Sequence, residues 1–313
     1  MGSGIFARPT VSQNDHATGH IIQSLVVNLA ITLAKFVAAF FTGSGAMLAE
    51  AIHTSADCSN QILLLLGVKR ARKQPDVAHP LGYGRELYFW SFMVAMLLFT
   101  GGGVFSVYEG IHKILRPEPV DHVLVGLGVL LFSFVLEGGS ALSNVKEINK
   151  RRGATRFVPY LRATKDSDLI VVFGENAAAS LGLVFAMGSI GLASVTGQGL
   201  WDGVGSLLVG LVLLGVAIFL AVEVKSLLVG EGADPHIDQA VRAVAVEHPQ
   251  IESVLRVLAV QQGPGEIMLA MKVRMRAGLS GEQLVDAINA FERTLKARIT
   301  EIRWCFVEPD YEA

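Results

Sequence analysis

Residues 202–238 read DGVGSLLVGLVLLGVAIFLAVEVKSLLVGEGADPHID, and this stretch joins two regions of different composition. Its first part is an apolar run long enough to cross the roughly 30 Å hydrocarbon core of a bilayer. After Lys225 the sequence becomes polar, and no later run has the length of a membrane span. The stretch therefore predicts a membrane region followed by a separate domain outside the membrane.

The composition of the whole chain agrees with this division. Of its 313 residues, 51% are hydrophobic and 17% are charged, whereas about 25% are charged in an average soluble protein. These values exclude a fully soluble enzyme. The formal net charge of −2 argues against nucleic acid as a partner. Cys58 and Cys305 lie far apart and outside any CxxC pair, which excludes a disulfide framework and a zinc ribbon.

Hydropathy along the chain predicts six membrane spans. They cover residues 21–42, 46–67, 87–114, 121–144, 168–194 and 201–224. Lys and Arg are concentrated between the second and third and between the fourth and fifth spans, so both termini are expected in the cytoplasm. The expected domains are a cytoplasmic N-terminal segment at 1–20, a six-helix transport domain at 21–225 and a cytoplasmic domain at 226–313.

The last of these domains has the pattern of a small α+β fold. The expected elements are a helix at 238–247, strands at 251–260 and 266–275, a helix after Ser280 and a strand at 299–308. Ser280 and Gln283 have the spacing of a capping box, and an apolar stripe follows them at helical spacing. The order αββαβ predicts a ferredoxin-like domain with both helices on one face of the sheet.

The second span carries ionisable side chains at membrane depth. Its segment AEAIHTSADCSNQ, residues 49–61, places His53 and Asp57 one helical turn apart. An imidazole nitrogen and a carboxylate oxygen suit zinc and are acceptable to cobalt, iron or manganese. The alternative is that both groups only form hydrogen bonds with neighbouring helices. Ionisable groups inside a membrane are costly and usually functional, which favours metal binding.

Longer segments around this pair resemble the cation diffusion facilitator family. The resemblance rests on TGSGAMLAEAIHTSADCSNQILLLLG, HPLGYGRELYFW, SVYEGIHKI, DGVGSLLVG and VKSLLVGEGADP, and it extends over nearly the whole chain. It implies a homodimer that exchanges divalent cations for protons. It also implies a transport site between the second and fifth spans, and tail domains that help the two copies associate.

The fifth span departs from the pattern that the resemblance implies. Val172 and Asn176 occupy the two positions where family members commonly carry ligands. Glu175 is the acid in the middle of this span, and the Glu-Asn pair resembles the Glu-Asp pair of the branch that includes vertebrate zinc transporter nine. Glu175 is one methylene longer than Asp and can reach a metal from the neighbouring helical position, with Asn176 offering a neutral oxygen. The alternative for Glu175 is helix packing.

Further polar residues have two interpretations each. Asn28 and Asn60 either hold the metal ligands in place as outer-shell hydrogen-bond partners or only form hydrogen bonds between helices. Glu50 accepts a proton or pairs with Lys35. His79, in the loop HPLGYGRE, is a candidate second metal ligand by the resemblance, or part of a turn rich in Pro and Gly.

Two functional hypotheses follow. In the first, the chain is a secondary transporter and not an enzyme: it exports divalent metal, zinc first because of His53, from the cytoplasm in exchange for protons. In the second, the departures in the fifth span mark a membrane metal-binding regulator or assembly partner that does not transport. Manganese, iron and cobalt are the alternative substrates. No organic cofactor is expected, and the expected membrane is a bacterial inner membrane.

Overall fold

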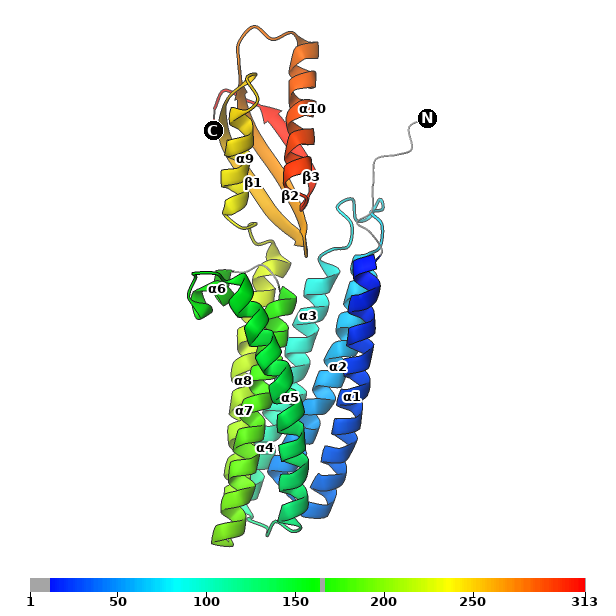
Figure 1. The fold of residues 1–313 in the computed structure, drawn as a ribbon, viewed down its shortest axis with the longest axis vertical. Helices are drawn as coiled ribbons and strands as arrows, with labels where there is room; N and C mark the ends of the chain where they lie inside the picture. Colours follow the sequence, from blue (N-terminus) through cyan, green and yellow to red (C-terminus); the bar gives the residue numbers. More distant parts are fainter. Residues whose placement is uncertain (1–11, 164–166, 313) are drawn as a thin grey trace. The chain divides into compact units, whose positions relative to one another are not determined.

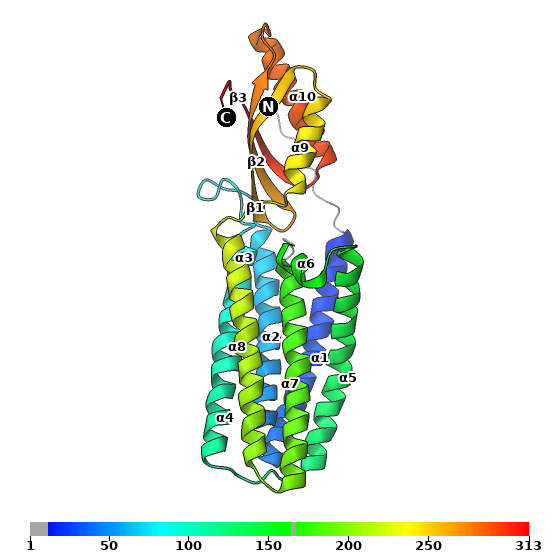
Figure 2. The ribbon, with the colours of Figure 1, turned by 90° about the vertical axis from the view of Figure 1, so that its left-hand side faces the viewer.

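The structure is a computed structural model that describes residues 12–163 and 167–312. Its long helices run side by side as a bundle (Figures 1 and 2). The helical elements are α1 (Ser12–Thr42), α2 (Gly45–Ala71), α3 (Glu86–Leu97), the π-helix η1 (Leu98–Val104), α4 (Phe105–Leu115), α5 (Val123–Arg151), α6 (Phe157–Ala163), α7 (Ser167–Thr196) and α8 (Leu200–Val229).

Four helices of the described residues are long and apolar enough to cross a membrane. They are Glu86–Leu115, Val123–Arg151, Val171–Thr196 and Leu200–Val229, and Asn28–Thr42 is a shorter apolar segment. Helix α2 is not among them, because the polar groups expected at its centre lower its hydropathy. The prediction of six spans is thus supported for four of them and stays a prediction for the first two.

The helices extend beyond the predicted spans. Helix α1 begins at Ser12 where the sequence predicts a start near residue 21, and α5 continues to Arg151. Backbone hydrogen bonds do not end where the hydrocarbon ends, so hydropathy underestimates the length of a helix that continues into water.

The bundle is packed inside and apolar outside, as expected of a protein surrounded by lipid. Buried Ala, Leu, Ile and Met side chains of several helices form one core cluster. Phe40 and Phe132, by contrast, expose 84% and 61% of their surface. Glycines allow α4 and α8 to approach closely: a Cβ atom at Gly110 would lie 2.5 Å from the backbone nitrogen of Leu207.

The C-terminal part has the predicted αββαβ order. Its elements are α9 (His236–Val246), β1 (Ile251–Gly263), β2 (Glu266–Met275), α10 (Gly281–Arg298) and β3 (Ile302–Pro309). The sheet order is β1-β2-β3, with β1 antiparallel and β3 parallel to β2. Both helices cover the same face of the sheet (Figure 2). The predicted capping box is present, with Ser280 and Gln283 bonded to each other's backbone.

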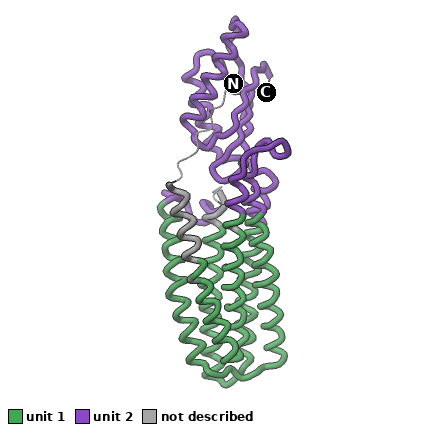
Figure 3. Tube along the Cα trace, turned by 90° about the vertical axis from the view of Figure 1, so that its right-hand side faces the viewer, with its two compact units in different colours: residues 1–66, 90–150, 171–221 green, residues 67–89, 151–170, 222–313 purple. Residues whose placement is uncertain are grey.

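Contacts along the chain define two compact units. The first contains residues 1–66, 90–150 and 171–221, and the second contains residues 67–89, 151–170 and 222–313 (Figure 3). The candidate ligands His53, Asp57 and Glu175 all belong to the first unit. Their geometry is therefore a property of the helix bundle alone.

Candidate metal centre

Helix α2 presents His53 and Asp57 on one face, as their spacing predicts. Nδ1 of His53 lies 3.7 Å from Oδ1 of Asp57, which is too far for a good hydrogen bond. The His53 side chain is fully buried and that of Asp57 is 15% exposed. Both ring nitrogens of His53 and Oδ1 of Asp57 are buried and have no hydrogen-bond partner in the described part of the chain. Because buried polar atoms are usually paired, these atoms are available to a ligand from outside the chain.

Helix α7 contributes Glu175 on the side that faces α2. Oε1 of Glu175 accepts a hydrogen bond of 2.8 Å from Nδ2 of Asn60. Asn60 is fully buried. Asn60 thus forms a hydrogen bond between the two helices that carry the candidate ligands, and its predicted outer-shell role stays a prediction.

The neighbours of Glu175 on α7 are oriented differently. Val172 exposes 40% of its surface, so this position does not point into the bundle. Asn176, four residues further on, is half-buried, and Asn28 on α1 is half-buried as well. Of Glu175 and Asn176, Glu175 is the residue for which the structure describes a hydrogen bond to α2. The roles predicted for Asn176 and Asn28 stay predictions.

Among the residues whose side chains the structure describes, no three or more His, Cys, Asp and Glu side chains are grouped so that they could hold a metal ion. His53 and Asp57 form a pair, and Glu175 is bound to Asn60.

A second group of buried charges lies one turn before His53. Nζ of Lys35 is 3.3 Å from Oε2 of Glu50 and 3.0 Å from Oε1 of Glu137, and it donates a bond of 2.8 Å to Oγ1 of Thr54. Lys35 and Glu50 are fully buried. The predicted pairing of Glu50 with Lys35 is confirmed, and Glu137 from α5 is an additional partner.

The loop that contains His79 forms a hydrogen-bonded turn. Oδ1 of Asp76 accepts bonds from the backbone nitrogens of Ala78 and His79, and its Oδ2 accepts bonds of 2.6 Å from Tyr83 and 2.9 Å from Lys73. The hydrogen bonds from Tyr83 and Lys73 hold the pKa of the Asp76 carboxyl well below its usual range. The imidazole of His79 is exposed and lies 4.2 Å from the Tyr83 ring. These contacts support the interpretation as a turn, and the second metal site stays a prediction.

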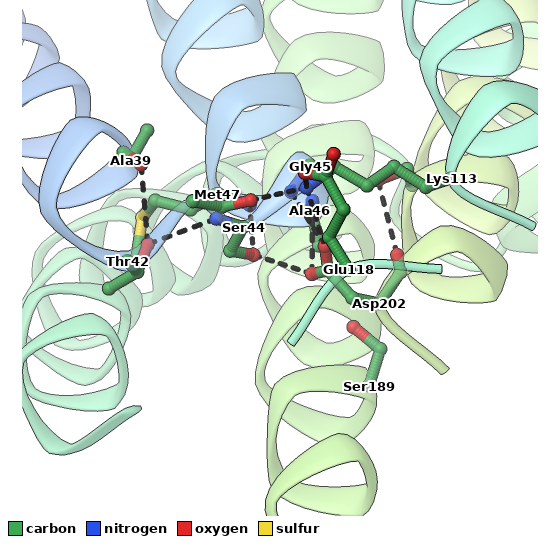
Figure 4. A network of polar contacts seen from close by, with 12 residues as sticks. Ala39, Thr42, Ser44, Gly45, Ala46, Met47, Lys113, Glu118, Ser189 and Asp202 are labelled. Carbon is green, nitrogen blue, oxygen red and sulfur yellow. Dashed lines mark hydrogen bonds and ion pairs between the residues drawn. The ribbon is translucent and has the colours of Figure 1, made fainter. Parts of the chain in front are cut away.

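At the opposite end of α2, the first turn is held by Asp202 of α8 (Figure 4). The fully buried carboxylate accepts hydrogen bonds from Oγ of Ser44 at 2.5 Å, from the nitrogen of Gly45 at 2.6 Å and from that of Ala46 at 3.3 Å. Nζ of Lys113 lies 3.9 Å from it. The sequence suggests a simpler role, as an acid at the start of its own helix. In the structure Asp202 also caps the neighbouring helix that carries His53 and Asp57.

Comparison with known proteins identifies the family. Residues 21–229 match the cation efflux transmembrane domain. The chain belongs to the cation diffusion facilitator family. The resemblance seen in the sequence is thereby confirmed, and the match covers every helix that carries a candidate ligand.

Among its relatives in the cation diffusion facilitator family is the proton-coupled zinc antiporter SLC30A9, mitochondrial, of Xenopus laevis. The two are 32% identical over 296 residues, covering 94% of this chain and 52% of the relative. The Homo sapiens protein of the same name is 32% identical over 255 residues, covering 81% of this chain and 45% of the relative. Metal tolerance protein C4 of Arabidopsis thaliana is 27% identical, covering 90% and 61%. The chain thus spans about half the length of the first two relatives.

Among solved structures, the cadmium form of a variant MamM C-terminal domain is similar to part of the chain. It is 16% identical with a TM-score of 0.24, and the match covers 25% of this chain and 98% of that one.

Two contacts in the structure cannot be predicted from the sequence. Glu137 reaches Lys35 across 102 positions, and Asp202 reaches Ser44 across 158. For the contact between Glu137 and Lys35, the sequence indicates only that an acid and a lysine lie in apolar spans, where such groups need partners. No sequence signal specifies which lysine and acid meet.

Proposed function

We propose that the chain is a secondary transporter that moves divalent metal cations, zinc first, out of the cytoplasm in exchange for protons. The observation that carries this proposal is the buried His53–Asp57 pair on α2, whose ring nitrogens and Oδ1 have no protein partner among the described residues. Glu175 faces the same helix from α7 through Asn60. The names of the relatives, a proton-coupled zinc antiporter and a metal tolerance protein, agree with this chemistry.

In the proposed cycle, the substrate metal binds to the neutral imidazole of His53 and the ionised carboxylate of Asp57. Glu175 then exchanges its hydrogen bond with Asn60 for the metal and completes the site. Metal needs deprotonated ligands, so each proton that enters from the other side weakens its binding and promotes release. Zinc fits better than magnesium or calcium because of the imidazole nitrogen.

The domain plan and topology are part of the proposal. Residues 21–225 form the transport domain with six spans, α2 being a polar one that neighbouring helices shield from lipid. Residues 226–313 form a cytoplasmic domain through which two copies associate. Both termini face the cytoplasm, since Lys and Arg are concentrated in the loops on that side. The expected bacterial inner membrane stays a prediction, because the animal relatives are named mitochondrial.

The test is metal flux into proteoliposomes that contain the purified full chain, with zinc and pH indicators and an imposed pH gradient. We expect zinc movement coupled to counterflow of protons in the wild type and loss of both in His53→Ala and Asp57→Ala. His112→Ala is the matched control, because His112 is an exposed histidine on α4.

Two results would overturn the proposal. Wild-type flux in His53→Ala and Asp57→Ala would show that these two residues do not form the transport site. Zinc binding without flux in the wild type would instead favour the membrane metal-binding regulator.

A further inference from the structure

The buried cluster around Lys35 lies one turn before the candidate metal ligands on α2 and contains neither of them. It consists of Lys35 from α1, Glu50 and Thr54 from α2 and Glu137 from α5. The Lys35 and Glu50 side chains are fully buried and that of Glu137 is 13% exposed. Such a group inside a membrane is costly to maintain, which indicates a function.

The contacts of Lys35 match the donor pattern of a charged ammonium. An ammonium has three N–H donors, and Lys35 directs them to Oε2 of Glu50, Oγ1 of Thr54 and Oε1 of Glu137. The Thr54 hydroxyl donates its own hydrogen to the backbone oxygen of Glu50, so it accepts from Lys35. All three donors of Lys35 are therefore used.

The two carboxyl groups have more oxygen atoms than Lys35 can supply with hydrogen bonds. Oε1 of Glu50 and Oε2 of Glu137 are buried and have no hydrogen-bond partner in the described part of the chain. One ammonium and two carboxylates leave one surplus negative charge in a medium that tolerates it poorly. One added proton would make the cluster neutral.

The surroundings of Glu50 favour it as the acceptor of that proton. The charged and titratable groups that act on it are Lys35 from α1, His53 from α2 and Glu137 from α5. From α7 its Oε1 meets Gly182, where any Cβ atom would collide with it. The glycine thus leaves room for the free oxygen of Glu50 beside a helix face that offers no counter-charge.

We propose that the Lys35–Glu50–Glu137 cluster is a proton-binding site and that Glu50 holds the proton when the metal site is empty. A dication at His53 and Asp57, one turn away on α2, favours the ionised form of Glu50. Its binding breaks the O–H bond of the Glu50 carboxyl and sends the proton to water, and metal release lets a proton return. The cluster thereby adds a proton to the exchange beyond those on the ligands. This inference rests on the proposed function.

The test counts protons released per zinc bound by the purified full chain in weakly buffered detergent solution with a pH indicator. Calorimetry measures zinc binding on the same samples. We expect Glu50→Gln to bind zinc and to release about one proton fewer than the wild type. Glu109→Gln is the matched control, because Glu109 is a half-buried acid on α4 outside the cluster, and its count should equal that of the wild type.

A second measurement does not depend on zinc. Infrared spectra of the metal-free protein near neutral pH should contain a carboxylic acid band that is absent from Glu50→Gln and present in Glu109→Gln. If Glu50→Gln fails to fold, Glu50→Asp, which keeps the carboxyl group, should shift this band without removing it.

Each outcome decides between the two proposals. Equal proton counts and equal infrared spectra in the wild type and Glu50→Gln would overturn the proton site and leave the cluster as an ion-pair network. Loss of the proton in Glu137→Gln, with the wild-type count in Glu50→Gln, would overturn its assignment to Glu50. Absence of zinc binding in the wild type, with the acid band present, would refute the proposed function but not the proton site.

Discussion

Replacing Asp202 tests whether one buried carboxylate fixes the end of the helix that carries the metal ligands. Asp202→Asn keeps the size of the side chain but removes its charge. It leaves one acceptor oxygen where two oxygens now receive bonds from Ser44, Gly45 and Ala46. It also removes one of the two carboxylates beside the almost fully buried Lys113; the other is that of Glu118, whose Oε2 lies 3.7 Å from Nζ.

The expected loss of stability follows from burial. A hydrogen bond to a charged group contributes about 1.5–3 kcal/mol, and removing one partner of a buried ion pair costs about 3–5 kcal/mol. We expect Asp202→Asn to lower the free energy of unfolding by about 3 kcal/mol or more. Ser44→Ala removes one donor to Asp202 and the acceptor of the Met47 backbone N–H, and it should cost roughly half as much.

The assay is unfolding of the full chain in mixed micelles with increasing dodecyl sulfate, followed by circular dichroism. Asp238→Asn is the control, because Asp238 forms an exposed pair with Arg242 on α9 and such pairs contribute about 0.3–0.5 kcal/mol. Equal unfolding midpoints for Asp202→Asn and Asp238→Asn would show that the cap on α2 contributes nothing, and the reasoning from burial would be wrong.

Three further predictions concern the ligand on α7, the tail domain and its thiol. Glu175→Gln should weaken zinc binding by at least about 10-fold and flatten the pH dependence of flux, whereas Asn176→Ala should resemble the wild type. The reverse result would make the amide of Asn176 the ligand. A fragment of residues 232–313 should fold and self-associate in the presence of a chelator, because its strands lack histidine, and cooperative unfolding by the chelator would contradict this. Cys305 should react slowly with iodoacetamide near neutral pH until the protein is unfolded, since burial raises the pKa of its thiol to about 12; fast alkylation of the folded chain would refute its burial.

The tail domain shows how far local patterns reach. Its strands, turn and second helix follow from alternation, Gly263 and Gly265, and the Ser280 capping box, and all of them are found in the structure. These signals act over a few residues, so the sequence contains them directly. The His53–Asp57 pair is of the same kind, because both residues lie on one helix.

The contacts between helices are of a different kind. The sequence favours Glu175 over Asn176 but keeps both as candidates, and the bond between Glu175 and Asn60 depends on how α7 is rotated against α2. On α7, Gly174 packs against the side chain of Leu220 and Gly182 against that of Glu50, both far away in the sequence. Hydropathy reports only that a helix is apolar, so neither the rotation nor the pairing of Glu137 with Lys35 can be predicted from it.

X-ray absorption at the zinc edge of the zinc-loaded full chain tests the central claim most directly. We predict a first shell of nitrogen and oxygen without sulfur, with an imidazole contribution at about 2.0–2.1 Å that disappears in His53→Ala and persists in His79→Ala. A sulfur shell, or an imidazole signal that survives His53→Ala, would contradict the assignment of the metal site to α2.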